Sequence, residues 1–123
     1  MKRVLLVDKN EAYRRLLALM FKWNTELKDS AEADSLAEAR RVLGNSESKP
    51  DLVIVNLGSA NADGFDLVKE LRMSAPEVPV LAITLRRDVE RRDRALRAGA
   101  GEVLPMAVSS KEIVDAAKRL VGE

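Results

Sequence analysis

The sequence predicts an α/β fold in which a single doubly wound, five-stranded parallel sheet carries helices on both of its faces. Three observations lead to this prediction. Short apolar runs alternate with segments whose apolar residues recur at helical spacing. The connections between them are short, which favours right-handed crossovers between parallel strands. The central run, residues 52–55, is unbroken and rich in β-branched residues, as in a strand that is covered on both faces.

Each expected strand is a short apolar run bounded by polar or turn-forming residues. The strands are expected at residues 4–7, 27–31, 52–55, 80–84 and 103–104. The run at 27–31 is polar for a strand, so we place it at an edge of the sheet, where one side meets water. Pro105 ends the last run.

Three of the expected helices start at residues that cap helices well, and two stop at a glycine. They run from Asn10 to about 21, from Asp34 or Ser35 to about 43, over 65–73, over 87–98, and from Ser109 to about 121. Ser109 and Glu112 have the spacing of a capping box. Gly44 and Gly99 follow two of the helices as natural stops.

The first helix is expected to bury one face. Its apolar residues at helical spacing, which we expect to face the core, are Tyr13, Leu16, Leu17 and Met20. Arg14, Arg15 and Lys22 are expected to point elsewhere. The only tryptophan, Trp23, is expected to pack against the end of this helix.

Composition excludes several classes of function. The chain has 123 residues, which we interpret as one domain over 1–123, and its net charge of +1 gives no overall attraction to nucleic acid or to an anionic membrane. With no cysteine and no histidine, thiol nucleophiles, histidine bases and the usual zinc sites are excluded. The first apolar run has four residues, too short for a signal peptide or a membrane span, and the lack of cysteine fits a cytoplasmic location. Neither glycine-rich phosphate-binding motif of nucleotide-binding folds is present.

The order and spacing of several segments resemble the receiver domain of response regulators (CheY-like), over nearly the whole chain. The matching segments are Val-Leu-Leu-Val-Asp at 4–8, Pro-Asp-Leu-Val-Ile-Val at 50–55, Asp-Gly at 63–64, Pro-Val-Leu-Ala-Ile-Thr at 79–84, Arg-Ala-Gly-Ala at 97–100, and the final helix. The resemblance implies a flavodoxin-like fold and a role in two-component or phosphorelay signal transduction. It also implies a site where an aspartate accepts a phosphoryl group beside Mg²⁺.

The chain departs from this family at the positions that carry the chemistry. The acceptor position at the end of the third strand is Asn56, and the second acidic position after the first strand is Lys9. Met106 stands where the family has a lysine; a shift of one residue would place Leu104-Pro105 there, again without lysine. Asp8 and Thr84 remain as typical groups, and Val103 replaces an aromatic residue of the signalling switch.

These departures predict a receiver that is not phosphorylated. Asn56 offers a neutral amide, whereas an acyl phosphate needs a carboxylate nucleophile. With one carboxylate left, we expect Mg²⁺ binding to be weak or absent and no metal site. One hypothesis is that the Lys9 ammonium takes the place of the metal and pairs with Asp8; the alternative is that Lys9 points to solvent while backbone amides hold Asp8.

Two alternatives to a naturally degenerate site follow from the same residues. Asn56 could be an engineered block in an otherwise working receiver, although Lys9 and Met106 are atypical too. Another carboxylate could accept the phosphoryl group, but Asp51 begins the central strand and Asp63 lies in the loop after it.

Six arginines lie in the segment before Gly99: Arg86, Arg87, Arg91, Arg92, Arg94 and Arg97. In receivers the equivalent helix, with the last strand and the last helix, forms an output or dimer surface. Here that surface would include Arg87, Arg91, Arg94 and Val103. Arginine suits contacts with the carboxylates of an acidic partner.

The alternative is a solvated helix whose arginines pair within it. Three acid–arginine pairs have the favourable spacing of four residues with the acid first: Asp88–Arg92, Glu90–Arg94 and Asp93–Arg97. Nucleic-acid binding is not expected, because no recognition motif accompanies these arginines.

The sequence therefore predicts a non-enzymatic signalling module that acts through a protein partner or a homodimer. The competing hypothesis is a sensor whose emptied pocket near Asp8, Asn56 and Thr84 binds a small ligand. No positive feature of the sequence favours this second hypothesis.

Overall fold

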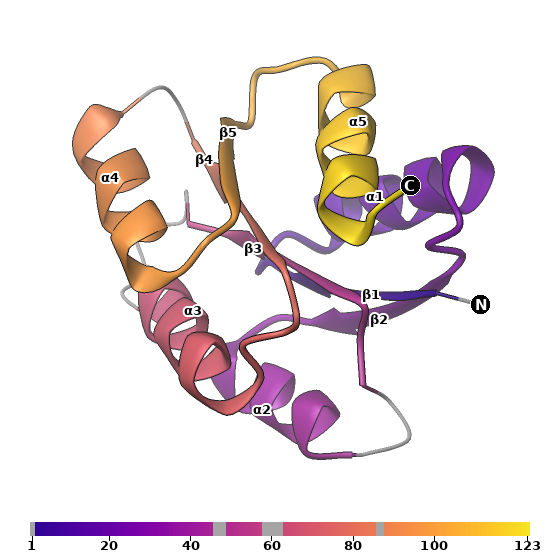
Figure 1. Ribbon diagram of the computed structural model, residues 1–123. Coiled ribbons are helices and arrows are strands. Elements are labelled where there is room, and N and C mark those ends of the chain that lie inside the picture. The colour runs from indigo at the N-terminus through magenta and orange to yellow at the C-terminus, as the bar shows by residue number, and fades with distance from the viewer. Residues whose placement is uncertain (1, 46–48, 58–62, 86–87) are drawn as a thin grey trace.

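Five parallel strands form one sheet through the middle of the molecule (Figure 1). The computed structural model describes residues 2–45, 49–57, 63–85 and 88–123. The strands are β1 (Arg3–Val7), β2 (Asp29–Ala33), β3 (Leu52–Asn56), β4 (Val80–Thr84) and β5 (Glu102–Pro105). Their order in the sheet is β2-β1-β3-β4-β5, and every neighbouring pair is parallel. This confirms the doubly wound parallel sheet and the edge position of the polar second strand.

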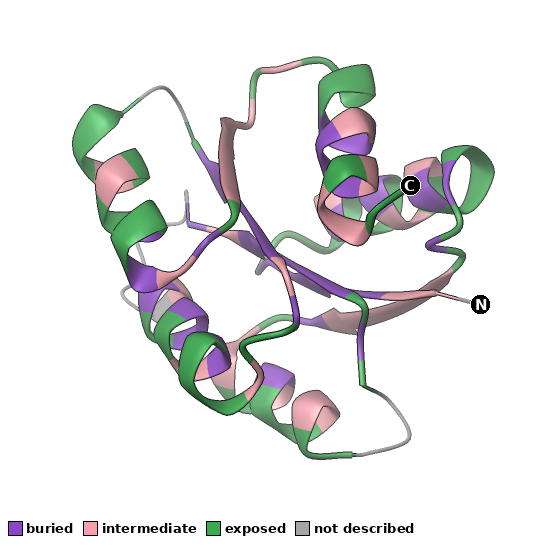
Figure 2. Ribbon diagram, in the orientation of Figure 1, coloured by how far each residue is buried: buried purple, intermediate pink, exposed green. Residues whose placement is uncertain are grey.

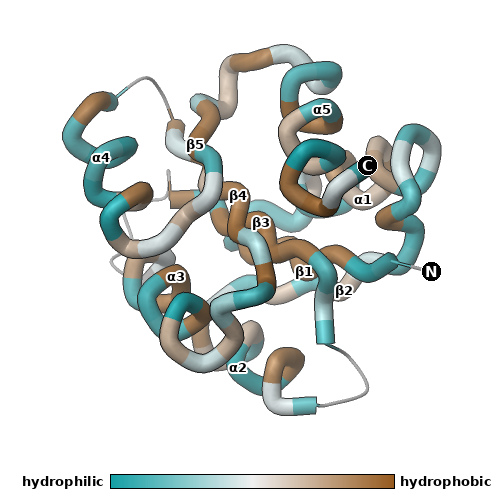
Figure 3. The backbone as a smooth tube through the Cα atoms, viewed as in Figure 1, coloured by the Kyte–Doolittle hydropathy of each residue, from teal (hydrophilic) through white to brown (hydrophobic). Residues whose placement is uncertain are grey.

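Helices cover both faces of the sheet, as predicted. They are α1 (Glu11–Asn24), α2 (Leu36–Gly44), α3 (Asp63–Ser74), α4 (Val89–Ala98) and α5 (Ser110–Val121). Helices α1 and α5 lie together on one face, while α2, α3 and α4 lie on the other (Figure 1). In the view of Figure 3 the strands form a hydrophobic centre, and hydrophilic residues are most frequent on the helices and loops around it.

The sheet separates two apolar cores. The core under α2, α3 and α4 contains Val53, Val55, Phe65 and Leu71, and the core under α1 and α5 contains Ile54 and other residues. Successive residues of β3 therefore point into opposite cores, as a strand buried on both faces requires. Figure 2 shows the inner strands β1, β3 and β4 as largely buried, whereas the edge strands β2 and β5 are mostly of intermediate burial.

The predicted N-caps form where the sequence placed them. The side chains of Asn10, Ser35 and Ser109 each accept a hydrogen bond from the backbone N–H three residues later. Asp88 caps α4 in the same way, so that helix begins at Val89, later than the predicted residue 87. Helix α3 starts at Asp63, two residues earlier than predicted.

The second strand lies two residues later than predicted. Its register pairs Asp29 with Arg3 and Ala33 with Val7, so strand β2 covers 29–33 rather than 27–31. Leu27 is fully buried, but it precedes the ladder. The apolar residue misled the prediction because burial and strand pairing start at different residues.

The expected inward face of α1 was partly wrong. The buried residues of this helix are Arg14, Leu17 and Phe21, whereas Leu16 is 52% exposed. Arg14 is buried because its guanidinium finds polar partners inside, a possibility that apolar spacing alone does not reveal. Trp23 is 77% exposed and does not pack against the helix end as expected.

Among the described residues, no helix has the length and apolar character needed to cross a bilayer.

Candidate functional site

The polar residues that the sequence analysis selected come together at the carboxyl edge of the sheet. In parallel strands this edge is shared, and the register places Val7 beside Val55 and Thr84 beside Pro105. The residues that follow or end these strands, Asp8 and Asn56 among them, therefore meet at one site. This is where ligands and chemistry gather in open α/β folds.

Asn56 and Asp8 are directly hydrogen-bonded. The Asn56 amide nitrogen donates to the Asp8 carboxylate Oδ2 over 2.8 Å. Asp8 is only 7% exposed, so its charge depends on internal donors. A carboxylate can only accept, which fixes the orientation of the Asn56 amide with its NH₂ group toward Asp8.

The second oxygen of Asp8 is also occupied. The backbone N–H of Asn10 donates to Asp8 Oδ1 over 2.9 Å. The buried Arg14 guanidinium donates to the backbone carbonyl of Asp8 and, through Nε, to Glu32 over 3.0 Å. Arg14 thereby ties the end of β1 to the edge strand β2. Both carboxylate oxygens of Asp8 are engaged within the chain.

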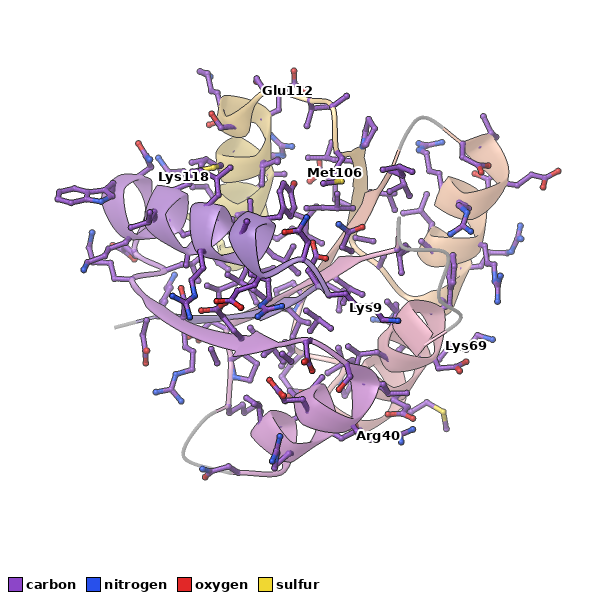
Figure 4. The ribbon with its side chains drawn as sticks, turned by 180° about the vertical axis from the view of Figure 1, so that it is seen from behind. Lys9, Arg40, Lys69, Met106, Glu112 and Lys118 are labelled. Carbon is purple, nitrogen blue, oxygen red and sulfur yellow. The ribbon has the colours of Figure 1, made fainter. Side chains whose placement is uncertain are left out.

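The hypothesis of a Lys9–Asp8 ion pair is wrong for this structure. Lys9 is exposed and forms no ion pair with any residue that the structure describes. It lies on the α3 side of the edge (Figure 4) and borders a hollow together with Gly64 and Leu67. The alternative, in which Lys9 points to solvent and backbone amides hold Asp8, agrees better with the structure. It is incomplete, because one of the two donors to the Asp8 carboxylate is a side-chain amide.

Met106 occupies the remaining side of Asn56. The Asn56 amide nitrogen also donates to the Met106 sulfur, at 3.7 Å, and the backbone N–H of Met106 donates to the Thr84 carbonyl over 2.7 Å. Thr84 is 3% exposed. Met106 is the residue that an alignment without a gap puts at the family's lysine position. Its thioether lies against the Asn56 amide.

The donor set does not fit a magnesium ion. Mg²⁺ prefers carboxylates and waters in octahedral geometry, whereas Asp8 has both oxygens committed to N–H donors. Nowhere in the described part of the chain do three acidic side chains gather as a cluster able to hold a metal. The described residues at this edge therefore supply no ligand set for the ion.

Tyr13 stands close to this site and was not selected from the sequence as a functional residue. Its hydroxyl is buried and has no hydrogen-bond partner in the described part of the chain. Burial raises the pKa of this phenol, and the negative charge of Asp8 raises it further. Tyr13 is therefore held neutral.

The hollow at the site is too small for a metabolite. It lies between the ends of β1 and β3 and the starts of α2 and α3, and its volume is about 30 Å³. Ligand pockets usually enclose roughly 300–1,000 Å³. A space of this size suits a water molecule, so it lends no support to a small-ligand sensor.

The α4 arginines use different partners from those that the spacing predicted. Asp88 pairs with Arg91 at 3.8 Å, and Arg92 pairs with Asp93 at 3.8 Å. None of the three predicted pairs four residues apart forms among the described residues. Asp88 is instead the helix N-cap, which directs its carboxylate to the first turn.

Two of these arginines reach α3 and the end of β3. Arg91 donates to the Leu57 carbonyl over 2.8 Å. The Arg94 guanidinium lies 4.0 Å from the centroid of the Phe65 ring, a cation–π contact. Val103 is half-buried against the core under α2, α3 and α4, which contains Phe65. Arg86 and Arg87 lie outside the described residues.

Sequence reasoning missed Arg14, Tyr13 and Asn10 as members of the carboxyl-edge site. Asn10 was identified only as a helix cap. The available signal was position, because all three lie two to six residues beyond Asp8, which directly follows the end of β1 at Val7. Their side chains or amides must therefore lie near its carboxylate.

Comparison with known proteins agrees with the geometry. The family model of the response regulator receiver domain matches residues 4–118. Response regulator MprA of Mycobacterium sp. (strain KMS) is 29% identical over 112 residues, which are 91% of this chain and 47% of that protein. The chain thus spans about half the length of the relatives it matches.

Solved receiver domains share the fold. A CheY-like receiver domain protein from Methanospirillum hungatei JF-1 matches with a TM-score of 0.87 at 18% identity, covering 99% of this chain and 94% of that one. The receiver domain of NtrX from Brucella abortus matches with a TM-score of 0.85 at 22% identity, covering 97% and 98%. The parallel sheet, its strand order and the matched family place this chain among the response regulator receiver domains of two-component signalling.

Proposed function

We propose that this receiver domain is not phosphorylated at the position of the family's acceptor aspartate and that it signals by protein contact. The observation that carries the proposal is the 2.8 Å hydrogen bond from the Asn56 amide to Asp8. The Asn56 amide donates a hydrogen bond to the negatively charged Asp8 carboxylate, which a bound metal would neutralise in a phosphorylatable site. It offers no anionic oxygen that could attack phosphorus.

The rest of the edge supports the same proposal. Met106 brings a thioether where a lysine would neutralise a phosphoryl group. Each oxygen of the Asp8 carboxylate already accepts a hydrogen bond from within the chain. Asn56, Lys9 and Met106 thus depart from phosphoryl chemistry together, which favours natural loss of the site over one engineered Asp-to-Asn substitution.

We further propose that the domain is non-enzymatic, occupies residues 1–123, and acts in the cytoplasm. Its partner, a second copy or another protein, would contact the surface of α4, β5 and α5. Arg91 of α4 and Val103 of β5 would contribute to that surface, whereas Arg94, which was also assigned to it, turns toward Phe65 of α3. A small-ligand sensor is not favoured, because the hollow at the edge has a volume of about 30 Å³.

The test is incubation with acetyl phosphate, read by intact mass spectrometry, and with beryllofluoride, read by fluorine NMR. We expect no phosphoryl adduct and no bound beryllofluoride on the natural chain. We expect little gain in Asn56→Asp, because Met106 supplies no positive charge. Asn24→Asp, an exposed position of α1, is the matched control for added charge.

An adduct on the natural chain that maps to the carboxyl edge would overturn the proposal. Rapid, stoichiometric labelling of Asn56→Asp but not of Asn24→Asp would show that Asn56 alone blocks the chemistry. In that case the contribution assigned to Met106 would be wrong.

A further inference from the structure

A groove between α3 and α4 is lined by positive charge from both helices. Its described lining residues are Lys69, Arg72 and Met73 from α3, with Arg94, Arg97 and Ala98 from α4. These include four cations and no acidic residue. The groove has a volume of about 350 Å³, within the usual range of binding pockets.

The four cations of the groove lie together without an acidic partner among the described residues. Within the described part of the chain, Lys69, Arg72, Arg94 and Arg97 form no ion pair. The chain as a whole carries a net charge of only +1. The positive charge of the groove is therefore balanced by acidic residues elsewhere on the chain.

The neighbouring contact of α3 shows what a compensated helix pair looks like in the same protein. On the side facing α2, Arg40 of α2 forms an ion pair with Glu70 of α3. Lys69, one residue earlier, projects from α3 away from this pair (Figure 4). Like charges facing each other across two helices disfavour the packed state slightly. Stability alone therefore does not account for the groove.

The cations are held in place by apolar and backbone contacts. The Arg94 guanidinium lies over the Phe65 ring. The stem of Arg72 packs against Gly99, which has a φ of 124°, and a Cβ there would come within 3.0 Å of it. Side chains that are already ordered lose less entropy when they bind.

We propose that the α3–α4 groove binds a short acidic segment of a protein partner that also carries an apolar side chain. Carboxylates would contact the guanidinium groups and the ammonium group, for which arginine has suitable geometry. The apolar side chain would cover Met73, which is 86% exposed, and Ala98. The inference rests on the proposed function in one respect, namely that the partner is a protein.

The groove's composition favours a peptide over a nucleic acid. Single-stranded nucleic acids bind through stacking on exposed aromatic rings as well as through charge. The one aromatic ring beside this groove among the described residues, that of Phe65, is buried and covered by Arg94. A thioether and a methyl group offer an apolar contact for a peptide side chain instead.

The test uses fluorescence anisotropy with a short labelled peptide of glutamates interrupted by leucines, at physiological ionic strength. The comparison probes are the same peptide with glutamine in place of glutamate, a single-stranded DNA of similar length, and inorganic tripolyphosphate. The natural chain is expected to bind the glutamate peptide in preference to all three. Binding should weaken as salt is added, because exposed charges are screened.

Charge reversal locates the site. The double variant Lys69→Glu with Arg97→Glu is expected to lose at least about tenfold in affinity, the effect of removing one or two charge-assisted contacts. The control is Lys22→Glu with Lys28→Glu, which makes the same change in net charge on exposed residues elsewhere. Met73→Asp at an exposed position tests the apolar contact, and thermal melting shows that each variant folds.

Failure of the peptide to bind the natural chain overturns the inference. Equal loss in the Lys22 and Lys28 control overturns it as well, because the binding would then reflect net charge alone. Tighter binding of DNA or tripolyphosphate than of the glutamate peptide would also overturn it, because the groove would then prefer a polyanion other than an acidic peptide. These outcomes do not depend on phosphorylation, so the inference and the proposed function fail separately.

Discussion

The carboxyl edge of the sheet and the α3–α4 groove treat charge in opposite ways. At the edge, Asp8 is buried and accepts hydrogen bonds on both carboxylate oxygens from within the chain. In the groove, four cations face solvent and form no ion pair with a described residue. In the first arrangement the fold itself supplies a donor to each carboxylate oxygen, whereas in the second the charged groups are open to a partner.

This contrast separates a degenerate site from a surface that can still bind. A buried charge must be satisfied by the fold itself, because leaving it unpaired costs several kcal/mol. Exposed charges are hydrated by water when no partner is bound, so a protein can keep them unpaired at small cost. Unpaired charges on a surface are thus able to bind a partner. A buried charge whose donors come from the fold has a structural role.

Replacing the amide at the edge with a carboxylate should have the largest effect. Asn56→Asp removes a donor to Asp8 and adds a second negative charge within hydrogen-bonding distance. We expect a loss of about 2–3 kcal/mol in the free energy of unfolding at neutral pH. The loss should shrink as pH falls, because protonating the introduced carboxyl restores a donor. Urea unfolding across pH measures this, and a variant as stable as the natural chain at neutral pH would contradict it.

The groove should be sensitive to a methyl group at its edge. Gly99→Ala imposes a side chain on a backbone with φ of 124° and pushes against the Arg72 stem at 3.0 Å. We expect a loss of about 1–3 kcal/mol from this strained conformation, with weaker binding of the glutamate peptide because Arg72 moves. Gly44→Ala, where the added Cβ meets no atom within 4 Å, is the control and should keep its stability.

Removing the arginine that lies on Phe65 should have a smaller effect. Arg94→Gln loses the cation–π contact at 4.0 Å, worth about 0.5–1 kcal/mol at such a site. Arg97→Gln, at an exposed residue without an ion pair among the described residues, should leave the melting temperature nearly unchanged. Equal effects of the two substitutions would show that Arg94 gains nothing from the ring.

Neutralising the groove from within should slightly stabilise the free protein. Lys69→Glu places an acid among Arg72, Arg94 and Arg97, and we expect a gain of about 0.3–0.5 kcal/mol at low salt. Added salt should reduce the gain. Lys22→Glu, in the last turn of α1, should give no gain. A loss of stability in Lys69→Glu would mean that the lysine has a structural role.

The smallest effect at neutral pH is expected for Tyr13→Phe, which removes a buried hydroxyl without a described partner. Because burial and then Asp8 raise the pKa of Tyr13, the unfolded chain ionises first. The contribution of Tyr13 to the free energy of unfolding is therefore fully present below the ordinary phenol pKa of 10.0. It is lost as the pH rises through the higher pKa of the folded state.

In Tyr13→Phe this part of the alkaline loss should disappear. Tyr13 is the only tyrosine, so the phenolate absorbance follows its titration directly. Titration of the native chain at the pKa of an unfolded tyrosine would contradict the predicted direction.

The order of the elements, the parallel sheet and most caps could be predicted from the residues alone. Apolar periodicity and cap chemistry are local properties of neighbouring residues, as Asn10, Ser35 and Ser109 illustrate. Asn56 could be assigned to the site because the carboxyl ends of parallel strands share an edge, and the family resemblance added Asp8 and Met106.

How those residues pair depends on contacts that form only in the folded chain. Arg14 is buried although its spacing suggested exposure, because Glu32 on β2 and the Asp8 carbonyl reach it from other parts of the chain. Lys69 and Arg72 join the α4 arginines although they are distant in sequence, because α3 packs beside α4. Ion pairs and grooves depend on distances between elements far apart in the chain, and a local pattern holds no information about such distances.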